Sequence, residues 1–196
     1  GDKHIPLIHN VMNTDIVAGI SDAATDGLNL VFTTDSGKEY LKSEHQISEE
    51  IVENLKHLGF SSICNMMASI KTAKELNLGP NDVIMTVATD GSELYESEKA
   101  HLMRDKYPNG FTAKDAHEIF TSHVVNADSQ HLEILSDVGR NRIFNLGYYT
   151  WVEQQGISVE DFDARRSQEF WNELHKFPPI WDEMIREFNA QTGVSA

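Results

Sequence analysis

Cysteine and long apolar runs are scarce in this chain of 196 residues. The single cysteine, Cys64, excludes a disulfide within these residues and weakly favours a cytoplasmic location. Its neighbours include Ile63, Met66 and Met67, so we expect a small buried residue there rather than a nucleophile. No apolar run approaches the roughly 20 residues of a membrane-spanning helix, so we expect no membrane partner.

Positively charged residues are also few, and the glycines do not cluster. The chain has 16 lysines and arginines against 31 aspartates and glutamates, a formal net charge of -15 at pH 7. This balance argues against nucleic acid and anionic membranes as partners. The 12 glycines stand apart, so no glycine-rich phosphate loop is present.

Residues 59–97 are the most informative part of the sequence. Apolar residues at helical spacing follow Ser61 and Ser62, either of which is suited to cap a helix. Residues 83–88 form a short, mostly apolar run, which predicts a strand buried on both faces. The polar triplet Thr89-Asp90-Gly91 follows at once, where open parallel sheets bind their ligands.

The rest of the sequence predicts mainly helices, with one more strand at residues 15–20. The expected elements are a helix from Ser21 to Thr33, a turn at residues 34–37, helices from Ser48 and over residues 93–106, a helix opened by a Thr112–Asp115 capping box, helical segments including residues 132–135 and 143–152, a helix over residues 159–174 broken by Pro178-Pro179, and a helix over residues 180–191. Two strands alone make a poor sheet, so we expect the missing strands to come from another chain.

Three segments in order carry a family resemblance: residues 1–6, reading Gly-Asp-Lys-His-Ile-Pro; residues 59–62, reading Gly-Phe-Ser-Ser before a helix that ends at Ala73-Lys74; and residues 87–95, which contain Thr89-Asp90-Gly91. They resemble the second half of the cysteine synthase-like, fold-type II pyridoxal-phosphate enzymes, to which the tryptophan synthase β subunit is similar. The resemblance implies an α/β fold, with a partial doubly wound sheet completed by another chain. Residues 1–106 would then belong to the cofactor-binding domain and residues 107–196 to a helical extension.

The family's cofactor lysine and its glycine-rich phosphate loop have no counterpart here. Lys71 and Lys74 lie inside an apolar helix pattern, and the chain begins with Gly1 rather than Met. We therefore expect a C-terminal portion of an enzyme, whose N-terminal half or companion subunit carries the cofactor lysine, in an oligomeric assembly.

The resemblance implies pyridoxal 5'-phosphate as cofactor and a small amino acid as substrate. The substrate would lose its α-proton and then a β-substituent, in an elimination or a replacement. Thr89, Asp90 and Gly91 would bind the cofactor; a carboxylate on the pyridine nitrogen would keep it protonated, whereas a hydroxyl would not. The same triplet also suits a simple chain-reversing turn.

The resemblance further implies a substrate lid made of Lys3, His4, Ser61 and Ser62, with Lys3 or His4 as tentative catalytic groups. A frayed terminus and simple helix capping are the alternatives for these positions. No metal is expected, because the six-residue spacing of His117 and His123 puts the two rings on different helix faces.

Two further alternatives stay open. Arg140 and Arg142 could reach an acidic substrate or a partner, although an amphipathic docking helix explains them better. The whole chain could also be a non-catalytic, acidic helical subunit that only binds another protein.

Overall fold

The computed structural model describes residues 5–194, so Lys3 and His4 lie outside the described residues. The chain divides into two compact units. We call residues 16–133 the central unit, and residues 5–15 with 134–194 the terminal unit. Each unit is described by itself.

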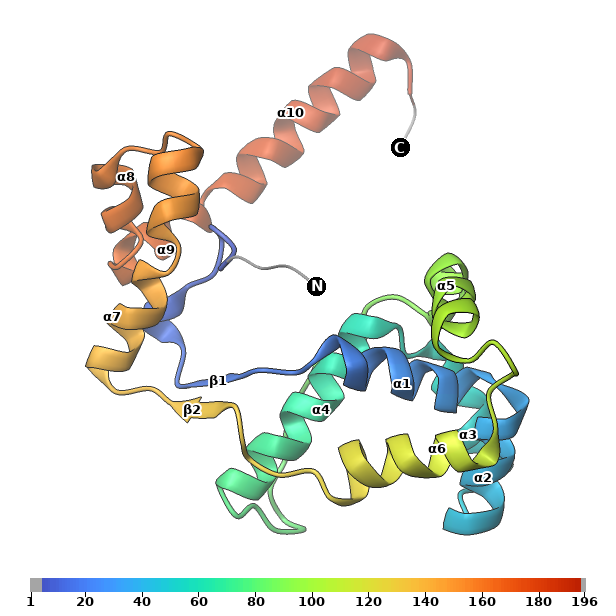
Figure 1. The fold of residues 1–196 in the computed structure, drawn as a ribbon. Coiled ribbons are helices and arrows are strands. Elements are labelled where there is room, and N and C mark those ends of the chain that lie inside the picture. Colours follow the sequence, from blue (N-terminus) through green and yellow to red (C-terminus); the bar gives the residue numbers. More distant parts are fainter. Residues whose placement is uncertain (1–4, 195–196) are drawn as a thin grey trace. The chain divides into compact units, whose positions relative to one another are not determined.

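The central unit is built mainly of helices (Figure 1). Its helices are α1 (Asp22–Thr33), α2 (Asp35–His45), α3 (Glu49–Asn54), η2 (Leu55–His57), α4 (Phe60–Glu75), η3 (Ser92–Tyr95), α5 (Glu96–Lys106), α6 (Ala113–Phe120) and the π-helical turn η4 (Thr121–Val125).

Helix α1 is the centre of this unit. Ser21 begins it as predicted, because its hydroxyl accepts a hydrogen bond from the Ala24 amide. Leu28, Leu30 and Val31 are fully buried. The helix contacts α2, α4, α5 and α6, so apolar side chains around most of its circumference are covered.

The predicted turn at residues 34–37 is wrong, because α2 follows α1 directly. The Thr34 hydroxyl accepts from the Gly37 amide and so begins the second helix. A Cβ atom at Gly37 would lie 2.6 Å from the Val31 Cα atom. Glycine therefore lets the first turn of α2 lie against the backbone of α1.

The only sheet of the described residues pairs β1 (Ile16–Ala18) with β2 (Leu132–Ile134). The Leu135 amide donates to the Asp15 carbonyl, and the Gly19 amide donates to the His131 carbonyl. These pairs run in opposite directions along the two strands, so the sheet is antiparallel. The strand expected at residues 15–20 is present in shorter form, whereas the helix expected over residues 132–135 is wrong.

The expected doubly wound α/β sheet is wrong as well. Residues 83–88 form no strand, and Val83 and Met85 are 84% and 92% exposed. A strand buried on both faces needs neighbouring strands to bond its backbone and helices to cover it. Among the described residues no strand pairs with this segment, α4 meets only part of it, and the fold is mainly helical.

The terminal unit has a smaller core. Its elements are η1 (Val11–Asn13), α7 (Asp137–Asn145), the π-helical turn η5 (Tyr149–Gln154), α8 (Val159–Ala164), α9 (Gln168–Leu174) and α10 (Phe177–Thr192). Val11, Phe144 and Phe162 are buried together, and the two phenyl rings lie 4.7 Å apart. The Trp151 indole donates to the Ile5 carbonyl and so ties the N-terminal segment to this core.

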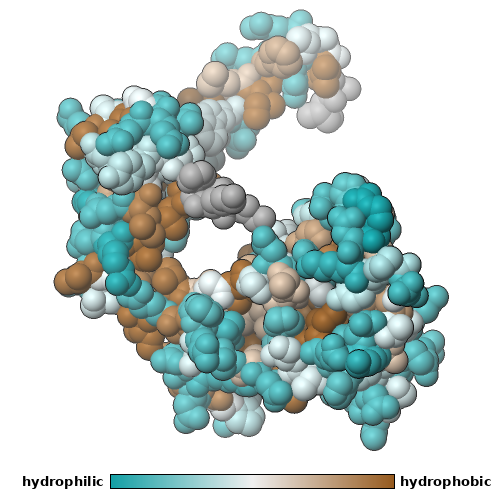
Figure 2. Space-filling model, in the orientation of Figure 1, coloured by the Kyte–Doolittle hydropathy of each residue, from teal (hydrophilic) through white to brown (hydrophobic). Residues whose placement is uncertain are grey.

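The expected break before the last helix is present, because α9 ends at Leu174 and α10 begins at Phe177, with Pro178 and Pro179 in its first turn. A proline there costs nothing, because the first amides of a helix have no partner within it. Helix α10 carries a line of exposed apolar residues: Phe177, Ile180, Trp181, Met184, Ile185 and Phe188. Apolar residues are visible on its surface in Figure 2.

The sequence resemblance placed a domain boundary between residues 106 and 107, which fall between α5 and α6 of the central unit. That division rests on the resemblance and stays a prediction. No helix in the described part of the chain is long and apolar enough to cross a membrane.

Candidate functional site

The N-terminus of α4 meets the segment that carries Thr89 and Asp90. The Gly59 amide donates to the Asp90 carbonyl at 2.7 Å. The Thr89 amide donates to the Ser62 hydroxyl at 2.9 Å, and the Asn65 side-chain amide donates to the Val87 carbonyl at 2.9 Å. The two segments are therefore held together although they lie 27 residues apart in the sequence.

Glycine at position 59 is what permits this approach. A Cβ atom on Gly59 would lie 2.6 Å from the Asp90 carbonyl oxygen and 2.8 Å from a ring carbon of Tyr95. Gly59 is also the N-cap of α4, so the expected capping role of Ser61 or Ser62 is wrong. Ser62 is only 3% exposed, and its hydroxyl binds the neighbouring segment instead of capping the helix, whereas Ser61 is exposed.

Thr89 and Asp90 are both exposed. The Tyr95 hydroxyl donates to Asp90 Oδ2 at 2.8 Å, and the Tyr95 ring lies 4.6 Å from that of Phe60. The hydrogen bond to the Asp90 carboxylate raises the pKa of Tyr95. Among the described residues no group donates to the other carboxylate oxygen of Asp90, so that oxygen is available to accept a hydrogen bond.

A mostly apolar cavity of about 300 Å³ adjoins this cluster. It lies between α4 and the extended segment, and Ser62, Met66, Ile70, Ile84 and Ala88 line it. The cluster and this cavity together form the candidate site. Of the predicted site residues, the structure brings Ser62, Thr89, Asp90 and Gly91 together; Lys3 and His4 stay predictions.

Lys71 and Lys74 both bind the loop that follows η4. Lys71 Nζ donates to the Asp128 carboxylate at 3.3 Å and to the Gln130 carbonyl at 2.9 Å. Lys74 Nζ donates to the Ala127 carbonyl. The side-chain nitrogens of both lysines are thus engaged by oxygens of this loop.

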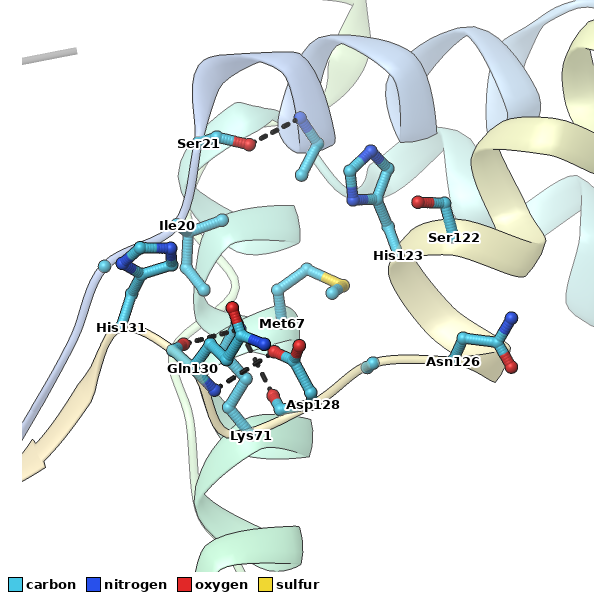
Figure 3. Close-up of a pocket in the computed structure, with 13 residues that line it drawn as sticks. Ile20, Ser21, Met67, Lys71, Ser122, His123, Asn126, Asp128, Gln130 and His131 are labelled. Carbon is cyan, nitrogen blue, oxygen red and sulfur yellow. Dashed lines mark hydrogen bonds and ion pairs between the residues drawn. The ribbon is translucent and has the colours of Figure 1, made fainter.

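Lys71 lines a cavity of about 300 Å³ whose wall is part polar and part apolar (Figure 3). His123 and His131 lie on its wall, together with Ser122 and Asp128. Burial, aided by the Lys71 charge, lowers the pKa of His123. The sequence did not single out this cavity, because loop 126–131 reaches it across 57 residues of intervening chain and carries no motif.

The sequence also raised the questions of a metal site, a cysteine nucleophile and an arginine contact. No group of three histidine, cysteine, aspartate or glutamate side chains among residues 5–194 is placed to hold a metal. Cys64 is half-buried, and burial raises the pKa of its thiol, which disfavours a nucleophilic role. Arg140 binds Asp15 at 2.8 Å and Asp137 at 3.2 Å, and so holds α7 to the chain before β1.

Comparisons with protein-family models, with curated proteins and with solved structures found no match for this chain. The functional argument therefore rests on the residues and their geometry.

Proposed function

We propose that this chain is one part of a pyridoxal-phosphate enzyme of the cysteine synthase-like class, acting at the β-carbon of a small amino acid. A companion polypeptide would carry the cofactor lysine in a cytoplasmic, oligomeric enzyme. One observation supports this most: two of the three segments that resemble the family, residues 59–62 and 87–91, are hydrogen-bonded to each other.

The cofactor's pyridine nitrogen is the group that these residues fit. Asp90 offers a carboxylate acceptor and Thr89 a hydroxyl, both exposed. A carboxylate on the ring nitrogen keeps it protonated, and the bound cofactor then accepts electrons from bonds at the substrate's α-carbon. In this proposal Ser62 and Gly59 position Asp90, and Asp90 holds the proton at the ring nitrogen.

The other two ends of the cofactor require groups from the companion. The phosphate needs several backbone amides, which glycine-rich loops supply, and the glycines of this chain do not cluster. The aldehyde needs a neutral lysine, whereas Lys71 and Lys74 are engaged by the loop after η4. The companion is thus an essential part of the proposal.

A partner-binding role without catalysis is the second candidate, and exposed apolar residues favour it. Val83, Met85 and Val87 are mostly exposed beside the cluster, and Trp181 and Phe188 are exposed on α10. Exposed apolar groups of this kind mark interaction surfaces. This candidate requires the companion polypeptide but not the cofactor. Cofactor binding by the complex therefore distinguishes the two candidate functions.

The deciding experiment is to purify the chain together with its companion polypeptide and record the absorbance spectrum with added pyridoxal phosphate. The catalytic proposal expects the near-visible band of a lysine-bound cofactor. After borohydride reduction, peptide mapping should find the label on a lysine of the companion. A complex without the band favours the binding candidate, and label on Lys3, Lys71 or Lys74 would overturn the assignment of the lysine to the companion.

Three variants assign the ring-nitrogen contact. Asp90→Asn keeps the shape and removes the charge, and should slow exchange of the substrate's α-proton by about tenfold or more if Asp90 holds the nitrogen's proton. Tyr95→Phe is the matched control, because it removes the hydrogen bond to the Asp90 carboxylate and leaves the charge. A larger loss in Thr89→Ala than in Asp90→Asn would move the contact to Thr89. Unchanged exchange in all three would remove this cluster from the mechanism.

A further inference from the structure

A third cavity lies in the terminal unit, and Ser62, Thr89 and Asp90 do not line it. Its volume is about 300 Å³. The N-terminal segment contributes Leu7 and Ile8, and α9 contributes Phe170, Trp171 and Leu174. These side chains are all apolar, so the wall suits a ligand with an apolar body.

One charged side chain in this wall is buried. Arg165 lines the cavity and is only 5% exposed. Its guanidinium carbon lies 4.4 Å from the centre of the Phe162 ring and 4.9 Å from that of Phe144. Its Nη1 atom donates to the Leu7 carbonyl at 2.6 Å, and Nε donates to the Phe162 carbonyl at 3.3 Å.

Within residues 5–194, Arg165 forms no ion pair with a carboxylate, and Nη2 donates to no described residue. Nη2 is also absent from the fully buried polar atoms without a partner, so it keeps some access to solvent. A buried cation is unfavourable when no anion pairs with it: burial and the Arg166 charge lower the pKa of Arg165, and the Asp163 charge offsets this only in part. The position therefore favours a bound anion.

The neighbouring arginine shows that the local sequence does not impose this arrangement. Arg166 is less buried, and its Nε donates to the Asp163 carboxylate at 3.0 Å. Its remaining nitrogens donate to the side-chain oxygens of Asn141 and Asn145. Arg166 is thus fully paired within the chain, whereas Arg165 keeps donor capacity at the cavity.

We propose that this cavity binds a small aromatic monocarboxylate, with its carboxylate on Arg165 and its ring against Phe170 and Trp171. Guanidinium groups bind carboxylates through paired, charge-assisted hydrogen bonds. The Trp171 indole donates to the Arg165 carbonyl at 2.8 Å, so the aromatic wall and the cation are held in one arrangement. Asp161 also lines the cavity and disfavours a second carboxylate on the ligand.

Calorimetric titration with four probes tests the proposal on the unmodified chain. Phenylacetate carries both the ring and the charge, phenylacetamide only the ring, acetate only the charge, and phenylmalonate a second carboxylate. Phenylacetate should bind about tenfold or more tightly than each of the others, since a charge-assisted pair and a buried ring each contribute. Equal binding of phenylacetate and phenylacetamide, or no saturable binding of phenylacetate, would overturn the proposal.

Two arginine variants then assign the anion contact. Arg165→Met keeps an apolar side chain of similar length and should weaken phenylacetate binding about tenfold or more. Arg166→Met should leave binding unchanged, because Arg166 does not line the cavity. An equal loss in both variants would contradict a specific role for Arg165. Should Arg165→Met fail to fold, the comparison of phenylacetate with phenylacetamide still decides.

His9 provides a spectroscopic readout that a purely structural effect would not move. Burial lowers its pKa, and the Arg165 charge lowers it further. A carboxylate bound to Arg165 offsets that second cause, so phenylacetate should raise the pKa of His9 as measured by NMR. Phenylacetamide should not. A His9 pKa that does not respond to phenylacetate would place the ligand elsewhere.

Discussion

Residues 28–32 of α1 and residues 83–87 are two short apolar runs in the same unit, and only the first is buried. Leu28, Leu30 and Val31 are completely covered, whereas Val83 and Met85 are almost fully exposed. The helix bonds its own backbone and meets α2, α4, α5 and α6. An extended run needs neighbouring strands to bond its backbone and other elements to cover its side chains. The composition of an apolar run therefore does not decide alone whether it is buried. The neighbouring elements that the fold supplies decide it as well.

The largest loss of stability is expected from a variant that leaves a cavity beside α1. Leu28→Ala should lower the free energy of unfolding by about 2–5 kcal/mol, because a fully buried leucine leaves a void that the neighbouring helices fill only partly. Chemical denaturation measures the change. The matched control is Leu94→Ala in η3, which is 68% exposed and should stay within about 0.5 kcal/mol of the unmodified chain. Similar losses in both variants would erase the contrast.

The junction of α1 and α2 should respond next in size. Gly37→Ala places a methyl group against the Val31 backbone, where no flexible side chain can give way. Overpacking of this kind costs about 1–3 kcal/mol. Gly79→Ala is the control, because its nearest neighbour is Asp82 Oδ2 at 3.8 Å. A neutral Gly37→Ala would mean that the two helices separate easily.

Local signals in the sequence predicted three helix starts of the central unit, whereas the starts of α2 and α4 were not predicted correctly. Ser21 and Ser48 begin helices, and the Thr112–Asp115 capping box is present. Each of these signals acts over three residues, within reach of one side chain. The turn at residues 34–37 was wrong because Gly37 serves a contact with another helix, which a reading of local propensity does not contain.

The sheet and the site were harder to predict for the same reason. The Leu132–Ile134 strand depends on β1, which lies more than 100 residues earlier, and no local pattern records that pairing. No local pattern records the meeting of residues 59–62 with residues 87–91 either. Arg165 belongs to no sequence motif, because the residues that form the cavity around it come together only in the folded chain.

A smaller effect is expected at the start of α1. Ser21→Ala removes the acceptor for the Ala24 amide and should cost about 1 kcal/mol, by the usual cost of losing an N-cap. Ser43→Ala is the control, since the Ser43 hydroxyl donates to a carbonyl on an exposed helix face and caps nothing. If the two losses were equal, the start of α1 would be secured by packing alone.

The smallest effect should come from the exposed run itself, and there the contrast is sharpest. Met85 is 92% exposed, so Met85→Ser should change the unfolding free energy of the chain alone by no more than about 0.5 kcal/mol. The same replacement at Met67, which is 2% exposed in α4, removes packed volume and buries a hydroxyl, and should cost about 2–5 kcal/mol.

Met85 would matter more in a complex than in the chain alone if residues 83–87 form the docking surface of the proposed companion polypeptide. Met85→Ser should then weaken the complex in sedimentation experiments, although the chain alone is as stable as before, because the methionine loses its contacts only in the complex. A binding defect without a stability defect separates the surface from the core in a single variant. Loss of stability in the isolated chain would show that residues 83–87 are already covered by this chain. Undiminished binding would move the docking surface to another apolar face, such as the exposed apolar residues of α10.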